Sequence, residues 1–123
     1  MDQRVIILGT DENQCNLISG LLKENGYKPQ VRNNFTILEK KLPRHEFSAV
    51  ILDLDSVSTD NHMFRCFKRN NPDIVLLAVS ARSFHPDLKE SMEKHIFACM
   101  LKPVDPDEIL FLLKSGCDKE ITT

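Results

Sequence analysis

The sequence predicts an α/β fold in which a parallel β-sheet carries helices on both faces. Short apolar runs, which are typical of strands buried on both sides, alternate along the chain with segments whose apolar residues recur at helical spacing. The chain of 123 residues, 41% of them hydrophobic, is long enough for one domain with a substantial core and too short for a second. A third observation is that three apolar runs end in a polar residue, as strands do at a binding edge.

Five apolar runs predict five strands. The second run is polar enough to suit an edge of the sheet, whereas the third is apolar throughout and indicates a buried parallel strand. The expected ranges are 5–8, 28–32, 49–54, 74–79 and 98–101.

Five helices are expected to follow these strands, and glycine or proline marks their boundaries. The first ends at Asn25-Gly26, because glycine readily takes the left-handed conformation that caps a helix. The second, carried by Phe35, Leu38 and Leu42, is expected to stop before a proline. The prolines used as boundaries are Pro43 and Pro72, at the ends of the second and third helices, and Pro86 and Pro106, at the starts of the fourth and fifth.

Charge and cysteine content exclude several classes of protein. Lys and Arg number 16 and Asp and Glu 18, with no basic segment, so direct nucleic-acid binding is disfavoured. The apolar runs are too short for a membrane span, and the N-terminus leads into a strand rather than a signal peptide, so we expect a soluble, cytoplasmic protein. The four cysteines are widely spaced, which favours free thiols over zinc ligands.

The polar residues that end three strands form a chemically coherent set. Asp53 closes the third strand, Ser80 follows the fourth and Lys102 follows the fifth. A carboxylate can attack phosphorus while a hydroxyl and a fixed cation bind the oxygens on which charge develops. A single strand-end Asp would more often just cap the next helix, but the three positions together predict a phosphoryl-transfer site.

Residues 4–116 resemble the receiver domain of response regulators in two-component signalling. Asp53 matches the phospho-acceptor aspartate, Ser80-Ala81 matches the Thr/Ser-Ala of the switch, and Lys102-Pro103 matches a Lys-Pro whose peptide bond is usually cis. The resemblance implies a flavodoxin-like, doubly wound (βα)₅ sheet with strand order 2-1-3-4-5. It also implies a receiver-like domain at 1–118, which leaves 119–123 as a tail or the start of a linker.

The resemblance further implies a magnesium site, but the acidic residues expected after the first strand are mostly absent. Gly9 and Thr10 stand where the family has its acidic pair, and an aspartate falls one place later. Each missing carboxylate weakens the attraction for a divalent cation, so we expect weak Mg²⁺ binding. The expected ligands are Asp11, Asp53 and the backbone carbonyl of Asp55, with Glu12 as a further candidate.

The resemblance implies that the chain is a phospho-acceptor switch and not an enzyme. The only catalysis it implies is, at most, removal of the domain's own phosphoryl group. A histidine kinase or phosphotransfer protein would supply the phosphoryl group to Asp53, and Lys102 and Ser80 would bind it. Ser80 would then bias the face formed by the fourth helix, fifth strand and fifth helix toward an output domain or partner protein. Cys99 stands at the aromatic switch position, so switching cannot use a tyrosine there.

Other interpretations remain open on the sequence. A pseudo-receiver would keep the fold and bind its partner without phosphorylation. The absence of acidic residues at Gly9 and Thr10 favours this interpretation. Asp53 and Asp55 also resemble the DxDx(T/V) motif of haloacid-dehalogenase-type phosphatases, in which they would act as nucleophile and general acid/base. That motif normally lies on the first strand of a longer chain. A nucleotide or flavin binder is disfavoured because no glycine-rich turn follows the first strand.

Overall fold

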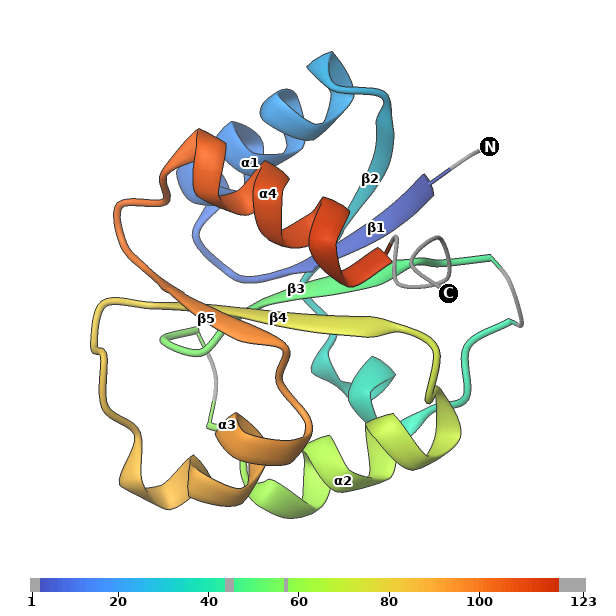
Figure 1. Cartoon of the computed structure of the whole chain (residues 1–123), viewed down its shortest axis with the longest axis vertical. Helices are drawn as coiled ribbons and strands as arrows, with labels where there is room; N and C mark the ends of the chain where they lie inside the picture. The colour runs from blue at the N-terminus through green and yellow to red at the C-terminus, as the bar shows by residue number, and fades with distance from the viewer. Residues whose placement is uncertain (1–2, 44–45, 57, 118–123) are drawn as a thin grey trace.

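A five-stranded parallel sheet forms the centre of the protein in the computed structural model, which describes residues 3–43, 46–56 and 58–117 (Figure 1). The strand order is β2-β1-β3-β4-β5, which confirms the predicted topology. Each prediction lies within two residues of the observed strand, and the predicted tail at 119–123 lies outside the described residues. The strands are β1 (Gln3–Leu8), β2 (Tyr27–Arg32), β3 (Ala49–Asp53), β4 (Val75–Ser80) and β5 (Ala98–Leu101).

The helical elements depart from the prediction at two places. The predicted second helix is wrong: only a 3₁₀ segment, η1 (Phe35–Glu39), forms there. The predicted fourth helix begins as a 3₁₀ turn, η2 (Pro86–Leu88), and continues as a short α-helix, α3 (Lys89–Lys94). The others are the α-helices α1 (Glu12–Glu24), α2 (Asn61–Asn70) and α4 (Pro106–Cys117).

Asn71 explains why the second helix stops after one turn. Its side-chain oxygen accepts the N–H of Leu42 at 2.8 Å, and its side-chain nitrogen donates to the carbonyl of Lys40 at 2.9 Å. Lys40 is extended, with ψ of 155°. Leu42 is buried, so the segment contributes its apolar side chain to the core without continuing the helix.

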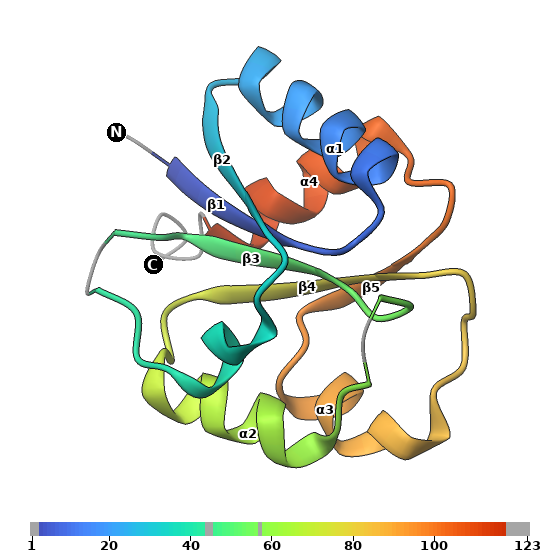
Figure 2. The ribbon, with the colours of Figure 1, turned by 180° about the vertical axis from the view of Figure 1, so that it is seen from behind.

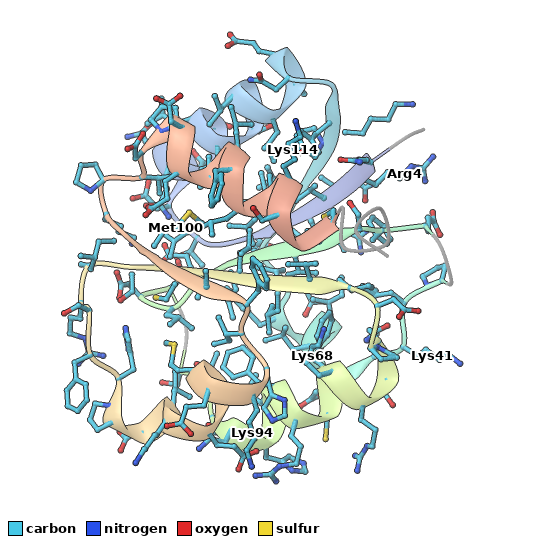
Figure 3. All side chains as sticks on the ribbon, viewed as in Figure 1. Arg4, Lys41, Lys68, Lys94, Met100 and Lys114 are labelled. Carbon is cyan, nitrogen blue, oxygen red and sulfur yellow. The ribbon has the colours of Figure 1, made fainter. Side chains whose placement is uncertain are left out.

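The two faces of the sheet carry separate layers of helices. Helices α1 and α4 cover one face, and η1, α2 and α3 cover the other (Figures 1 and 2). Successive residues of a strand point to opposite faces, so Val5 and Ile7 of β1 pack under α1 and α4 while Ile6 and Leu8 pack on the other side. Met100 of β5 joins the layer of α1 and α4 (Figure 3).

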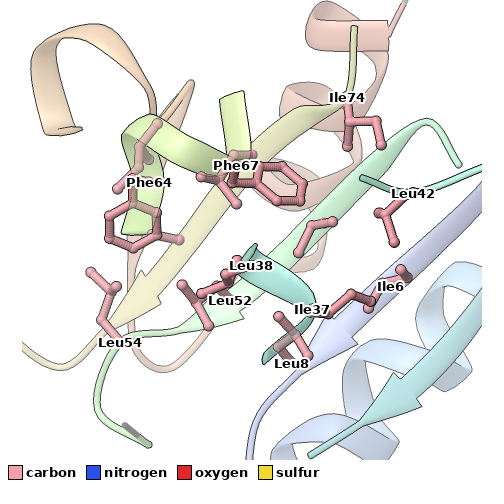
Figure 4. Packing of buried hydrophobic residues seen from close by; sticks show 14 of the residues in the cluster. Ile6, Leu8, Ile37, Leu38, Leu42, Leu52, Leu54, Phe64, Phe67 and Ile74 are labelled. Atoms are coloured by element: carbon pink, nitrogen blue, oxygen red, sulfur yellow. The ribbon is translucent and has the colours of Figure 1, made fainter. Parts of the chain in front are cut away.

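The layer of α2 contains the largest buried side chains. Phe64 and Phe67 of α2 are fully buried against Leu38 of η1 and Leu52 of β3 (Figure 4). Burial of each such side chain contributes about 1.5–3 kcal/mol. This packing fixes α2 on the sheet and so holds the loop that leads from β3 into it.

The register of the strands brings the three polar strand ends to one edge. Asp53 of β3 pairs with Val79 of β4, and Ser80 of β4 pairs with Leu101 of β5. The residue after Leu101 is therefore one step beyond Ser80 at the carboxyl edge of the sheet. In the part of the chain that the structure describes, every helix is too short or too polar to cross a membrane.

Candidate functional site

Asp53 and Lys102 form the centre of the candidate site. The Nζ atom of Lys102 lies 3.0 Å from Oδ1 and 3.1 Å from Oδ2 of Asp53. The side chain of Asp53 is only 4% exposed, so this contact is a largely buried ion pair. The peptide bond between Lys102 and Pro103 is cis, as the sequence predicted.

Three further groups donate hydrogen bonds to the Asp53 carboxylate. The Asp55 backbone N–H bonds to Oδ1 at 3.0 Å. The Ser56 hydroxyl and the Gln14 side-chain amide bond to Oδ2 at 2.9 Å and 3.1 Å. Ser56 is itself held by the N–H of Thr10 at 3.1 Å, so the loops after β1 and β3 are joined at the site. Gln14, in the first turn of α1, and Ser56, in the loop after β3, were not identified from the sequence; their nearness in sequence to Asp11 and Asp53 was the only signal.

The side chain of Asp55 belongs to the site, whereas the expected metal site included only its backbone carbonyl. The Asp55 carboxylate accepts three hydrogen bonds. The Ser80 hydroxyl donates to Oδ1 at 3.0 Å, while the Ala81 N–H and the Lys102 ammonium lie 2.7 Å and 3.0 Å from Oδ2. Burial acts to raise the pKa of Asp55, but the bonds from Ala81, Lys102 and Ser80 together lower it below its usual value. Asp55 is therefore a carboxylate at neutral pH, which disfavours a role as general acid.

Lys102 is kept charged by the same contacts. Burial acts to lower the pKa of its ammonium, but the hydrogen bonds to Asp53 and Asp55 raise that pKa above its usual value. One cation thus faces two carboxylates, and the cluster carries a net negative charge.

Ser80 joins the cluster through a hydrogen bond to Asp55. Its side chain is fully buried, its hydroxyl donates to Asp55, and its oxygen accepts the N–H of Arg82 at 3.1 Å. The sequence predicted that Ser80 would converge on Asp53 with Lys102. The structure brings all three to one edge and inserts Asp55 as the partner of the hydroxyl.

Asp11 caps helix α1. Its Oδ1 accepts the N–H of Gln14 at 3.2 Å, and Glu12 follows it in the exposed first turn. The buried Cys15 lies close enough for Asp11 and Asp53 to affect its thiol, whose pKa is raised by burial first and then by these two carboxylates. Asp11 is thus near the site but is used as a helix cap.

The residues around Asp53, as arranged, do not fit a divalent cation. Mg²⁺ needs oxygen ligands, whereas the Asp53 oxygens face N–H and O–H donors from Lys102, Gln14 and Ser56. Within residues 3–43, 46–56 and 58–117, no three His, Cys, Asp or Glu side chains are grouped so as to hold a metal ion.

Gly9 contributes to this arrangement through close approach. A Cβ atom added there would lie 3.1 Å from the Cys15 sulfur and 3.5 Å from the Asp53 Cβ. An acidic residue at position 9 would therefore need Cys15 to move.

A cleft opens beside the cluster between the loops that follow β3 and β4. Its volume is about 620 Å³. Asp55 and Ser56 lie on its wall, so the cleft leads to the carboxylate cluster from solvent. The lining residues are Leu54, Asp55, Ser56, Ser58, Thr59, Arg82, His85, Pro86, Asp87 and Leu88.

Comparisons with known proteins agree with this architecture. No protein-family model matches the chain. It is 29% identical over 117 residues to a protein of Rickettsia typhi described as an NtrX-like response regulator, an alignment that covers 93% of this chain and 25% of that protein. The chain thus spans about a quarter of the length of the curated relatives it matches.

Solved structures give the same class of fold. A CheY-like response regulator receiver domain protein from Methanospirillum hungatei JF-1 superposes with a TM-score of 0.81, at 16% identity over 99% of this chain and 98% of that one. The receiver domain of a sensor histidine kinase from Pseudomonas aeruginosa PAO1, solved with magnesium coordinated in its active-site cleft, gives a TM-score of 0.79 at 15% identity, covering 97% and 100%.

The fold is therefore that of a CheY-like response-regulator receiver domain, with the five-stranded sheet in the order 2-1-3-4-5. The sequence is distantly similar to response regulators of two-component signalling over nearly its whole length.

Proposed function

We propose that this chain is a signalling receiver domain in which Asp53 accepts a phosphoryl group. The observation that carries the proposal is the contact of one ammonium, from Lys102, with both oxygens of a buried carboxylate at the carboxyl edge of the sheet. That edge is where α/β proteins of this topology bind ligands. A histidine kinase or phosphotransfer protein is the partner that this fold implies.

The chemistry proposed for Asp53 is nucleophilic attack by a carboxylate oxygen on phosphorus. A P–O bond forms to Asp53 while the bond from phosphorus to the donor nitrogen breaks, and the nitrogen keeps the electron pair and takes up a proton. Lys102 stabilises the negative charge on the phosphoryl oxygens. Attack by Oδ2 requires Gln14 and Ser56 to release that oxygen, because both donate to it, whereas Oδ1 accepts from the backbone N–H of Asp55.

The proposed output surface is the face formed by α3, β5 and α4. In Figure 1, β5 runs between α3 and α4 at the open edge of the sheet. Phe97, Leu101 and Phe111 are 44%, 50% and 68% exposed on these elements or the loop before β5. Exposed large apolar side chains on these neighbouring elements favour a protein partner, and the position of Leu101 next to Lys102 connects the surface to the site.

Mass spectrometry of the intact protein tests this function. Incubation with acetyl phosphate and Mg²⁺ should add the mass of one phosphoryl group to the wild type and none to Asp53→Asn. A wild type that remains unmodified under conditions that modify a control receiver domain would contradict the acceptor assignment.

A second candidate function is constitutive partner binding without phosphorylation. It is favoured by the replacement of the family's acidic pair with Gly9 and Thr10 and by the Gln14 amide on Asp53. In that case Asp53→Asn should leave partner binding unchanged, whereas substitution of Phe111 by Ala should weaken it. The acceptor function predicts that Asp53→Asn removes a phosphorylation-dependent change in binding.

A further inference from the structure

Three hydrogen-bond donors, two from consecutive residues at the end of β4 and one from the residue after β5, converge on the carboxylate of Asp55. They are the Ser80 hydroxyl at the end of β4, the Ala81 N–H that follows it, and the Lys102 ammonium after β5. The shortest of these contacts is the 2.7 Å bond from Ala81. A hydroxyl, a backbone N–H and an ammonium aimed at one point form a pocket for an oxyanion.

This pocket lies directly beside Asp53. The Lys102 Nζ atom lies 3.0 Å from an oxygen of Asp53 and also 3.0 Å from an oxygen of Asp55. The two carboxylates are therefore neighbours that share one ammonium. The backbone N–H of Asp55 additionally donates to Asp53. An anionic group attached to Asp53 would compete with Asp55 for the Lys102 ammonium, which contacts both carboxylates, and for the neighbouring donors of Ser80 and Ala81.

We propose that the Asp55 carboxylate is a built-in anion that fills an oxyanion pocket made by Ser80, Ala81 and Lys102, and that a phosphoryl group must displace it. The pocket takes phosphate-like oxyanions when Asp55 is removed. The consequence for signalling rests on the proposed function, whereas the existence of the pocket does not. With Asp55 in place, Ser80 and Ala81 are held in the anion-bound arrangement before any phosphorylation occurs.

Several features of the cluster support displacement of the Asp55 carboxylate by a phosphoryl group. Ser80 is fully buried, and its hydroxyl has Asp55 as acceptor and the Arg82 N–H as donor, which leaves it fixed in direction. The Asp55 side chain is 29% exposed and lies on the wall of the cleft, so it can swing out toward solvent. Lys102 keeps Asp53 as a partner when Asp55 leaves.

Binding of inorganic phosphate tests the proposal without any phosphoryl transfer. The wild type, Asp55→Ala, Asp55→Asn and Glu93→Ala would be titrated with phosphate at neutral pH and constant ionic strength, with the Ala81 amide followed by ¹H–¹⁵N NMR. Glu93 is an exposed carboxylate on α3 and serves as the matched loss of one negative charge.

The expected result is that Asp55→Ala binds phosphate at least about tenfold more tightly than the wild type or Glu93→Ala. The Ala81 amide proton should shift upfield on removal of Asp55 and return downfield as phosphate binds. Asp55→Asn should bind phosphate more tightly than the wild type but less tightly than Asp55→Ala, because its single amide oxygen can keep only one of the two acceptor positions that face Ser80 and Ala81. Adding Lys102→Ala to Asp55→Ala should abolish the gain.

A folded Asp55→Ala protein that binds phosphate no better than Glu93→Ala would overturn the proposal. If Asp55→Ala did not fold, Asp55→Asn would decide it in the same way, against the wild type. Failure of the acetyl phosphate experiment together with tighter phosphate binding by Asp55→Ala would reject Asp53 as an acceptor and leave the oxyanion pocket standing.

Discussion

The ammonium nitrogen of Lys102 contacts both carboxylate oxygens of Asp53, at 3.0 Å and 3.1 Å. It also contacts Asp55 at 3.0 Å, so removal of Lys102 leaves two neighbouring carboxylates without their shared cation. Lys102 is the structural as well as the electrostatic link between β5 and the loop after β3.

We predict that Lys102→Ala lowers the free energy of unfolding at pH 7 by about 1–3 kcal/mol, because a buried carboxylate loses its partner. Contacts that include Lys102 lower the pKa of Asp55, so their stabilisation is fully present above the usual Asp pKa and is lost as the pH falls below it. The loss should therefore be smaller at pH 3 than at pH 7. Urea denaturation at both pH values checks this, with the exposed Lys114→Ala as control. An equal loss at the two pH values would contradict the ion-pair account.

Asp55 should shorten the lifetime of a phosphoryl group on Asp53. Its carboxylate competes for Ser80, Ala81 and Lys102, which would otherwise stabilise the phosphorylated state. We expect Asp55→Asn and Asp55→Ala to lengthen the lifetime several-fold, with the larger effect for alanine. The decay of the phosphoprotein mass over time measures it, and decay that is unchanged or faster in both variants would refute the idea.

Because N–H and O–H donors face the Asp53 oxygens, Mg²⁺ must displace them to bind, so its affinity should be weak. Asp11 provides a way to separate metal binding from helix capping. Asp11→Asn keeps an oxygen that can accept from Gln14, so it should leave stability nearly unchanged and reduce the remaining Mg²⁺ affinity. Asp11→Ala should reduce that affinity and also cost about 1 kcal/mol of stability. Thr10→Asp should strengthen binding about tenfold by adding a carboxylate. Calorimetric titration with Mg²⁺ and thermal unfolding together test all three variants; tight binding that survives Asp11→Ala would point to another group.

Two glycines in helices should respond in opposite directions to alanine. A Cβ at Gly20 of α1 would meet nothing within 4 Å, so Gly20→Ala should stabilise the protein by about 0.5–1 kcal/mol through helix propensity. A Cβ at Gly116 of α4 would lie 2.9 Å from a methyl carbon of the buried Val75, so Gly116→Ala should destabilise by about 1–2 kcal/mol. Denaturant midpoints of the pair give the answer. If Gly116→Ala were as stable as Gly20→Ala, α4 would not be packed on β4 as described.

Glu90 on α3 should titrate far below an ordinary glutamate. Hydrogen bonds to its carboxylate lower the pKa of Glu90 to about 2. The two bonds from Arg65 of α2 have the largest effect, and the bond with His95 has the next largest. The stabilisation from this contact is present above the usual Glu pKa and is lost as the pH falls toward 2. A ¹³C titration of the Glu90 carboxyl group in the wild type and in Arg65→Ala measures it. A wild-type midpoint of about 4 or higher would mean that Arg65 and Glu90 are not paired in solution.

The sheet and its functional edge could be predicted because they depend on patterns that are local in the sequence. Apolar strands such as β3 and β4 are recognisable as short runs, and parallel pairing then places Asp53, Ser80 and Lys102 at one edge. The contact between Asp53 and Lys102, 49 residues apart, follows from that topology alone.

What could not be predicted depends on contacts between distant loops. The spacing of Phe35, Leu38 and Leu42 is helical, but Asn71, 29 residues beyond Leu42, takes the N–H of Leu42 and ends the helix early. The direction of the Asp55 side chain is likewise set by Ser80 and Ala81, about 25 residues away. No local pattern around Asp55 distinguishes a carboxylate that points to solvent from one that points into the site.

The order in which the site residues occur has a consequence during synthesis of the chain. Asp53 and Asp55 emerge 49 and 47 residues before Lys102, and the cation reaches them only when β5 pairs with β4 at the edge of the sheet. Domains fold as their last elements become available, so a nascent chain that ends before β5 holds two repelling carboxylates and no counter-charge. The charge balance of the site is thus completed by the last strand of this sheet to be made, and fraying of that four-residue strand would undo it first.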